Sequence, residues 1–168
     1  MIKLYITNLG KYNEGELVGD WFDCSDGEDA LYELLEDIGI NKEYEEYFIT
    51  DYETELNIAI SEYDNISHLI YLVDYIEAKN VDIDILNAIL EFESDLDNAV
   101  RVYINGDYSY IPYSPNSSLS YETQIGYYLL DEGFYGDIPD YLYNFIDAYK
   151  LGDESGYTFT DYGAIDIY

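Results

Sequence analysis

The sequence predicts an α+β fold, arranged as an elongated chain of three small modules. Apolar residues alternate with polar ones at the N-terminus, they fall at helical spacing in the middle, and both patterns return near the C-terminus. With 168 residues, of which 48% are hydrophobic, the chain can bury a core as one domain or as two or three small ones. We expect modules at residues 1–60, 61–104 and 105–168.

The first module is expected to be a small antiparallel sheet with one helix. Apolar and polar residues alternate along residues 2–6, which is the pattern of a half-buried strand, and Glu16–Asp23 and Glu46–Tyr52 are predicted to be two more strands. Ser25 and Glu28 fit a capping box at the start of a helix. That helix is predicted from apolar residues at helical spacing, namely Leu31, Leu34, Leu35 and Ile38.

The stretch NLGKYNEGELVGDWF, from Asn8 to Phe22, contains the glycines of a loop that could cradle a phosphate. Gly10, Gly15 and Gly19 are spaced by five and four residues, which matches neither the dinucleotide-binding nor the P-loop pattern. We therefore expect a loop between two strands, in which Gly10 and Gly15 turn the chain and Gly19 relieves crowding.

The middle module, residues 61–104, is predicted to be helical. Apolar residues form one stripe along Ile66–Ile76 and begin another at Leu86, and Asn80–Asp82 separates the two helices. A short third helix is predicted at Asp95–Val102.

The third module, residues 105–168, is predicted to combine helices with a hairpin. A loop rich in Pro and Ser covers Pro112–Ser118, and two helices are predicted at Leu119–Asp131 and Pro139–Lys150. The chain is expected to end in a hairpin of Tyr157–Thr160 with Ala164–Tyr168.

The net charge is the most unusual property of the sequence. Lys and Arg number 6 and Asp and Glu number 37, which gives a formal net charge of −31. The three modules carry net charges of −13, −8 and −10, so the acidity is not confined to a tail. Because 18% of the residues are aromatic, we expect a folded chain and not a disordered one. Such a charge excludes DNA, RNA and anionic membranes as direct ligands and favours basic partners.

Few residues are suited to catalysis or to binding a cofactor or metal. The only histidine, His68, is expected on the surface, and the only cysteine, Cys24, is expected to be a buried or half-buried bystander. Asp82, Asp84 and Glu93 match three ligand positions of an EF-hand, but the glycine required at its sharp turn is missing. Close carboxylate pairs would arise by chance. We therefore expect no catalytic residue, no cofactor and no metal.

The cellular location is expected to be the cytoplasm. A single cysteine excludes an internal disulfide and is typical of a reducing compartment. The first residues lack the features of a signal peptide, and no apolar run approaches the length of a membrane span.

The charge has the magnitude of a short DNA duplex. Duplex DNA carries one charge per about 1.7 Å of axis, so the 31 net charges correspond to about 50 Å, or about 15 base pairs. Such a surface would bind the Lys and Arg residues of a DNA-binding groove, and an elongated body suits it better than a sphere.

Four segments resemble the ArdA antirestriction family, which are DNA-mimic proteins of mobile genetic elements. They are NLGKYNEGELVGDWF, EYEEYFITDYE at Glu43–Glu53, YYLLDEGFYGDIPDYLYNFIDAY at Tyr127–Tyr149, and YTFTDYGAI at Tyr157–Ile165. The resemblance is weak between about residues 60 and 100. The family usually has Gly-Arg-Asp-Leu soon after the tyrosine-rich helix, whereas Leu151-Gly152-Asp153-Glu154 here lacks the arginine.

The resemblance implies a curved chain of three modules that forms a homodimer through the C-terminal module. It also implies a target, the DNA-binding site of Type I restriction-modification enzymes, chiefly their specificity and methyltransferase subunits. The expected function is therefore inhibition by a protein that is not an enzyme and binds no nucleic acid itself.

The residues expected to imitate DNA phosphates are exposed carboxylates of the first and third modules. They are Glu14, Glu16, Asp20, Asp23, Glu28, Asp29, Glu33, Glu36, Asp37, Asp131, Glu132, Asp137 and Asp140.

Three alternatives stay open on the sequence alone. The first is a general acidic protein that shields other basic DNA-binding proteins. The second is a hydrolase that uses two carboxylates, and the third is adaptation to high salt, in which the acidity has no specific partner.

Overall fold

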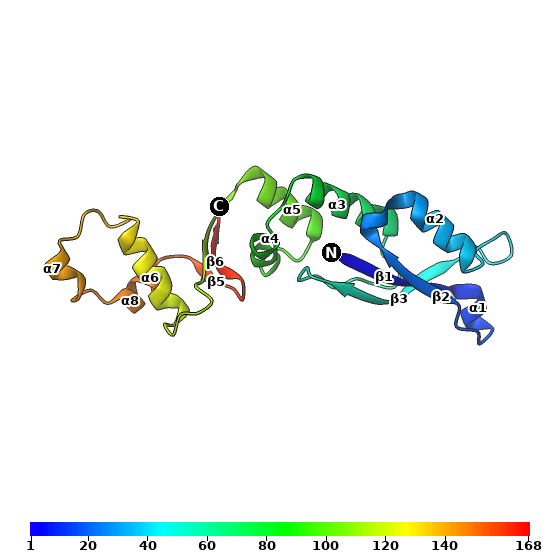
Figure 1. The fold of residues 1–168 in the computed structure, drawn as a ribbon, viewed down its shortest axis with the longest axis horizontal. Coiled ribbons are helices and arrows are strands. Elements are labelled where there is room, and N and C mark those ends of the chain that lie inside the picture. The colour runs from blue at the N-terminus through cyan, green and yellow to red at the C-terminus, as the bar shows by residue number, and fades with distance from the viewer. The chain divides into compact units, whose positions relative to one another are not determined.

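The computed structural model describes all residues 1–168, which divide into two compact units, Met1–Ile83 and Asp84–Tyr168 (Figure 1). Each unit contains helices and one three-stranded antiparallel sheet, which confirms the α+β class. The boundary between the units falls inside the predicted middle module, residues 61–104. The three-module division and the elongated shape stay predictions.

The sheet of the first unit is built around its first strand. β1 (Ile2–Asn8) lies between β2 (Gly19–Asp23) and β3 (Tyr47–Thr54), and both pairs are antiparallel. Alternate residues of β1 are fully buried on one face, namely Ile2, Leu4 and Ile6. The three predicted strands are therefore confirmed. β2 is shorter than predicted because the amide of Glu16 donates to the carbonyl of Lys11 and not to a strand.

The loop predicted between β1 and β2 contains a short helix, α1 (Leu9–Asn13), so the prediction was wrong there. The side chain of Asn8 caps this helix by accepting from the amide of Lys11. Gly10 does not turn the chain but faces the ring of Tyr44, which leaves no room for a Cβ. Gly15 has φ +88°, and at Gly19 a Cβ would lie 2.5 Å from the Ile6 carbonyl oxygen, so their predicted roles are confirmed.

Two longer helices complete the first unit, and Figure 1 shows them over one face of the sheet. α2 (Gly27–Asp37) packs Leu31 and Leu35 inward, and α3 (Ile66–Ala78) buries the predicted apolar stripe. The capping box at Ser25 and Glu28 was wrong. Residues Cys24–Asp26 form a 3-10 turn, η1, in which the amide and hydroxyl of Ser25 both donate to the Asp23 carboxylate.

The second unit begins with two helices and a strand. α4 (Ile83–Leu90) starts at the unit boundary, α5 (Leu96–Asn105) is capped by the Asp95 side chain, and β4 (Tyr108–Pro112) follows. Both helices had been predicted. β4 had not, because Gly106 and Pro112 suggest turns, yet a proline is tolerated in an edge strand such as this one.

The C-terminal hairpin is confirmed and joins β4 in a sheet. β5 (Thr158–Phe159) and β6 (Gly163–Ile167) pair antiparallel, and β6 also pairs with β4. A small core beneath this sheet includes Ile111, Ile125, Leu129 and Ala164. It fixes the sheet against α6 (Tyr121–Asp131), which was also predicted.

The single helix predicted over Pro139–Lys150 was wrong. The structure has α7 (Asp140–Tyr143) and α8 (Ala148–Asp153) with an irregular link between them. Asp147 interrupts the helix because its carboxylate accepts from the Lys150 amide and starts α8 as a new helix. The apolar residues at helical spacing that predicted this helix are consequently not buried, since Leu142 is 42%, Phe145 85% and Tyr149 50% exposed.

α6 and α8 cross so closely that glycine is required on both. A Cβ at Gly126 would overlap the carbonyl of Ala148, and a Cβ at Gly152 would overlap the carbonyl of Glu122. Both obstacles are backbone atoms, which a rotamer change cannot move. This contact therefore holds the two helices together by main-chain packing.

We predict that Gly126→Ala destabilises the second unit by about 1–3 kcal/mol through overpacking, although alanine favours a helix by about 1 kcal/mol over glycine. Urea unfolding followed by circular dichroism measures the change. Asp153→Ala, an exposed neighbour on α8, is the control and should leave the midpoint nearly unchanged. An unchanged or higher midpoint for Gly126→Ala would contradict the close crossing.

Candidate protein-binding surface

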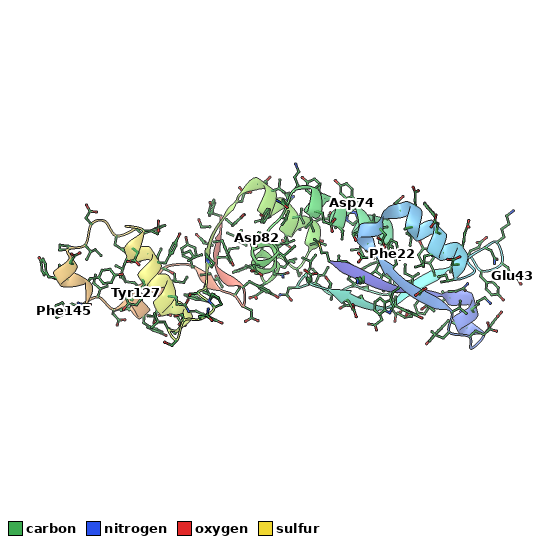
Figure 2. All side chains as sticks on the ribbon, in the orientation of Figure 1. Phe22, Glu43, Asp74, Asp82, Tyr127 and Phe145 are labelled. Atoms are coloured by element: carbon green, nitrogen blue, oxygen red, sulfur yellow. The ribbon has the colours of Figure 1, made fainter.

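The carboxylates expected to bind a partner are almost all exposed. Asp23 alone is half-buried, and the other twelve expected residues are exposed to solvent. Figure 2 shows further acidic side chains, among them Glu43, Asp74 and Asp82, projecting outward from the ribbon, in contrast to the buried Phe22. The structure thus places the expected residues where a partner could reach them, and their role in binding stays a proposal.

Helix α2 carries more carboxylates than any other helix of the protein. Five of its 11 residues are acidic and exposed, namely Glu28, Asp29, Glu33, Glu36 and Asp37, and all of them except Glu28 lie on the side opposite Leu31 and Leu35. At 1.5 Å per residue the helix is about 16 Å long, which gives one carboxylate per about 3.3 Å. One strand of duplex DNA carries a phosphate per about 3.4 Å of axis, so the linear charge density is the same.

This arrangement opposes the stability of the helix itself. Asp29 and Glu33, and Glu33 and Asp37, are like-charged pairs four residues apart, which destabilise a helix by about 0.2–0.5 kcal/mol each. Acids in the first turn suit the helix dipole, but those in the last turn do not, and α2 has no basic residue there. Burial of Leu31 and Leu35 therefore has to maintain a helix whose exposed face repels itself.

Tyrosine hydroxyls fix two of the expected carboxylates in place. The Tyr44 hydroxyl donates to both oxygens of Glu14, at 3.0 and 3.2 Å, and the Tyr143 hydroxyl donates to Asp131 at 2.5 Å. The hydrogen bond to Asp131 raises the pKa of Tyr143 to about 12, and the bond to Glu14 raises the pKa of Tyr44. Sequence reasoning missed the Tyr44–Glu14 pair because 30 residues separate its members.

Only a few ion pairs neutralise the acidic surface. Lys3 lies 3.9 Å from Asp23, Lys11 lies 3.5 Å from Glu16, and the side chain of Lys150 lies 3.8 Å from that of Glu154. Exposed pairs of this kind contribute little to stability. With 37 acidic and 6 basic residues, most carboxylates have no basic side chain to neutralise them.

The structure adds exposed carboxylates that the sequence analysis did not select. They lie in the turn before β3, on β3, in the loop before α3 and on the outer side of α3, and include Glu43, Glu45, Glu46, Asp51, Glu53, Glu62, Asp74 and Glu77. Those of α3 could have been found from the sequence, since they occupy positions that the apolar stripe leaves free.

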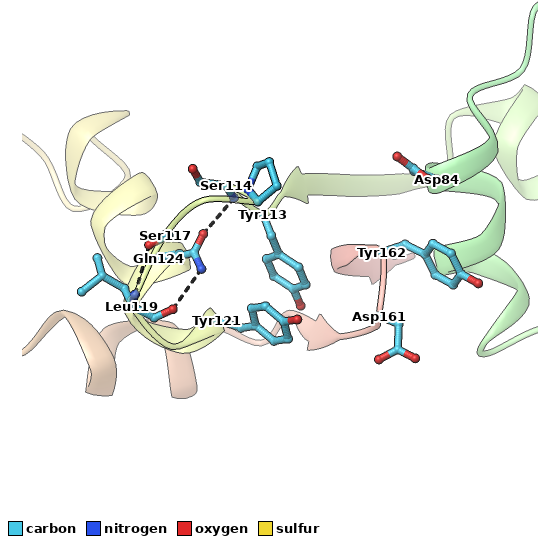
Figure 3. A pocket seen from close by; sticks show the side chains of 10 residues that line it. Asp84, Tyr113, Ser114, Ser117, Leu119, Tyr121, Gln124, Asp161 and Tyr162 are labelled. Atoms are coloured by element: carbon cyan, nitrogen blue, oxygen red, sulfur yellow. Dashed lines mark hydrogen bonds between the residues drawn. The ribbon is translucent and has the colours of Figure 1, made fainter.

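A pocket of about 580 Å³ lies in the second unit, beside the loop between β4 and α6 (Figure 3). Tyr113 stacks on Tyr121 at 3.9 Å, and burial raises the pKa of Tyr113 to about 12. The Thr160 amide donates to the carbonyl of Gly163, and the buried Tyr113 hydroxyl has no hydrogen-bond partner. Gln124 bonds Ser114 and Leu119, so its amide holds the loop.

The reactive side chains are placed as the sequence predicted. His68 is exposed, and Cys24 is fully buried, which raises the pKa of its thiol to about 12. No cluster of three or more His, Cys, Asp or Glu residues has a geometry that could hold a metal ion. None of the helices combines the length and the apolar character needed to cross a membrane.

The comparison with protein families decides the family. The model of the family described as Antirestriction protein (ArdA) matches residues 4–166, nearly the whole chain. The chain belongs to the ArdA antirestriction family. No curated protein matches it. Where ArdA proteins usually have Gly-Arg-Asp-Leu, this member has a buried glycine, Gly152, followed by two exposed acids, of which Glu154 pairs with Lys150.

The pKa of Asp23 gives a test of the surface geometry. The Ser25 hydroxyl is the main cause of the lowered pKa, and Lys3 adds to it. A lowered pKa stabilises the fold at pH values above the unfolded pKa of about 3.9, and this stabilisation disappears as the pH falls through the folded pKa.

We predict that Ser25→Ala raises the pKa of Asp23, as measured by NMR titration of its carboxyl carbon. The urea midpoint should fall at neutral pH, and the difference from the parent should shrink below about pH 4. Ser61→Ala, an exposed serine of the same unit, is the control. An unchanged Asp23 titration would show that the Ser25 contact does not form.

Proposed function

We propose that this ArdA-family protein is a DNA mimic, not an enzyme, that occupies the DNA-binding site of Type I restriction-modification enzymes. Its contacts are with the specificity and methyltransferase subunits. The observation that supports this proposal most strongly is the average density of carboxylates along α2, one per about 3.3 Å of helix axis, which is close to that of phosphates along one DNA strand.

The physical basis is competition for the same cations. A groove that binds DNA presents Lys and Arg to phosphates, and binding releases the counterions of both partners. Both units of the protein can contribute, since the first carries 21 carboxylates and four lysines, and the second carries 16 carboxylates with one lysine and one arginine. Higher salt should therefore weaken the complex with the enzyme.

A broader activity has some support from the same surface. Both units are acidic, and regular carboxylate arrays attract any basic groove. On this alternative the protein shields unrelated basic DNA-binding proteins, and its affinity for them would equal its affinity for a Type I enzyme. Binding measurements with a repressor and a nucleoid protein distinguish the two.

We predict that neutralising α2 as a block weakens displacement of duplex DNA from a Type I methyltransferase by about 5- to 30-fold, from about 0.2–0.4 kcal/mol per exposed charge. The block consists of Glu28→Gln, Asp29→Asn, Glu33→Gln, Glu36→Gln and Asp37→Asn. Each single change should alter displacement by about twofold or less.

The control for this block is its own stability. Removing like-charged pairs stabilises α2, whereas losing the first-turn acids Glu28 and Asp29 destabilises it, so the urea midpoint should change little and lost inhibition cannot be ascribed to unfolding. Failure of the parent protein to displace DNA would reject the proposed function. Full displacement by the block variant would reject the role of α2.

We also propose that the protein is a homodimer that pairs through residues 105–168. Exposed aromatic residues gather in the segment from α6 to α8, where Phe134 is 62% exposed, and Figure 2 marks Tyr127 and Phe145 there. Exposed apolar patches of this kind are typical of protein interfaces.

We predict that Phe145→Ser shifts the protein from dimer to monomer, since exposed aromatic residues often dominate an interface. Analytical ultracentrifugation over a range of concentrations measures the dissociation constant, which should rise about tenfold or more. Phe92→Ser, at an exposed phenylalanine outside residues 105–168, is the control. An unchanged constant for Phe145→Ser, or a monomeric parent, would contradict the proposal.

A further inference from the structure

One face of the β2-β1-β3 sheet is not covered by the helices of its unit. α2 and α3 lie over the face that buries Ile2, Leu4 and Ile6 (Figure 1). On the opposite face, Tyr5 of β1 is paired with Trp21 of β2 on one side and with Asp51 of β3 on the other. Two aromatic rings and a carboxylate thus form a row across the three strands.

A groove of about 500 Å³ lies on this face. Its walls include two aromatic pairs, Tyr5 with Trp21 at 5.4 Å and Tyr12 with Phe48 at 5.3 Å, and both pairs meet edge to face. Trp21 is 41% exposed and Leu17 is 69% exposed, so both are accessible to a ligand. Three of the wall residues, Tyr12, Leu17 and Trp21, come from the segment between Asn8 and Phe22.

The charged side chains that line the groove are all negative. Asp51 and Glu62 line it, and no lysine, arginine or histidine does. The Glu62 side chain makes no hydrogen bond or ion pair, whereas its backbone carbonyl accepts from Ile49 at 2.8 Å and fixes its position. One oxygen of Asp51 accepts from the amide of Tyr52 at 2.8 Å, which leaves the other for a ligand.

We infer that this groove binds an arginine side chain of the partner enzyme. The inference rests on the proposed function for the identity of the partner. A guanidinium stacks on aromatic faces and donates to carboxylates, so Trp21 and Tyr12 would cover its plane while Glu62 and Asp51 accept its hydrogen bonds. Lysine fits less well because its ammonium is compact and strongly hydrated.

Charge complementarity selects this occupant over others. A second copy of the chain would bring a net charge of −31 toward the carboxylates of the groove. Nucleic acids and anionic lipid surfaces would be repelled for the same reason. A basic side chain with an apolar stem gains contacts with the aromatic walls as well as with the acids.

The groove differs in kind from the carboxylate surface around it. Exposed carboxylates act as a sum, and each contributes little. Beside aromatic rings, a guanidinium gains stacking contacts in addition to its charge interaction, so a single carboxylate here should matter more than one elsewhere on the surface. The segment that first suggested a phosphate loop thus supplies one wall of a site for a cation.

The chain contains one tryptophan, Trp21, which makes it a local probe of the groove. The test uses acetyl-Gly-Arg-Gly-amide as the probe, with the citrulline peptide as its neutral counterpart. Tryptophan emission is excited where tyrosine does not absorb. We expect the arginine peptide to change the emission in a saturable manner and the citrulline peptide to leave it unchanged.

The variants are Glu62→Gln in the groove and Glu77→Gln on α3, which removes a matched exposed charge elsewhere in the unit. Glu62→Gln should raise the dissociation constant for the peptide about three- to tenfold, and Glu77→Gln by less than about twofold. Glu62→Gln should also weaken DNA displacement from the Type I methyltransferase more than Glu77→Gln does.

The peptide measurement and the DNA-displacement assay distinguish failure of the arginine site from failure of the proposed function. If the arginine peptide leaves Trp21 emission unchanged, or both variants bind it equally, the groove is not an arginine site, whatever the enzyme assay shows. If the peptide results hold but the parent protein does not displace DNA, the proposed function fails and the assignment of the occupant to a restriction enzyme is overturned.

Discussion

Repulsion among carboxylates, balanced against burial of a small apolar core, is the constraint on which this structure depends. The chain carries a net charge of −31, and α2 alone holds five acids on its exposed side. Its inner side is anchored by Leu31 and Leu35, while Ile2, Leu4 and Ile6 anchor the sheet of the same unit. The acids stay at fixed positions because the elements that carry them are held from within.

Fixed positions are what separate this surface from a flexible acidic tail. A rigid array does not have to be ordered when it binds, so less free energy is lost on association. The tyrosine hydroxyls that hold Glu14 and Asp131 act in the same direction. Membership of the ArdA family and the average carboxylate density of α2 are the two observations behind the proposal that the protein imitates DNA.

Periodicity predicted the elements whose apolar residues face a core of their own. β1, α3 and α6 follow from strand or helix patterns that the structure buries. It failed where a local hydrogen bond or a distant contact decided the outcome. Asp147 splits the helix predicted over Pro139–Lys150, and Asp23, not a capping box, bonds Ser25.

The candidate surface also has features that could be predicted from the sequence and features that could not. Exposure of Asp29, Glu33, Glu36 and Asp37 could be predicted because they occupy the positions of α2 opposite Leu31 and Leu35. The groove beside Trp21 could not, since it depends on the strand register that places Trp21 and Asp51 beside Tyr5. The alternation of apolar residues fixes which face Tyr5 and Trp21 occupy, but the pairing of Tyr5 with Asp51 joins residues 46 positions apart in the sequence.

The most direct measurement of the central claim is the salt dependence of binding between this protein and a Type I methyltransferase. If carboxylates replace phosphates, the logarithm of the association constant should fall linearly with the logarithm of salt concentration, and bound duplex should prevent binding altogether. A salt-independent constant, or a ternary complex containing enzyme, duplex and protein, would contradict the account.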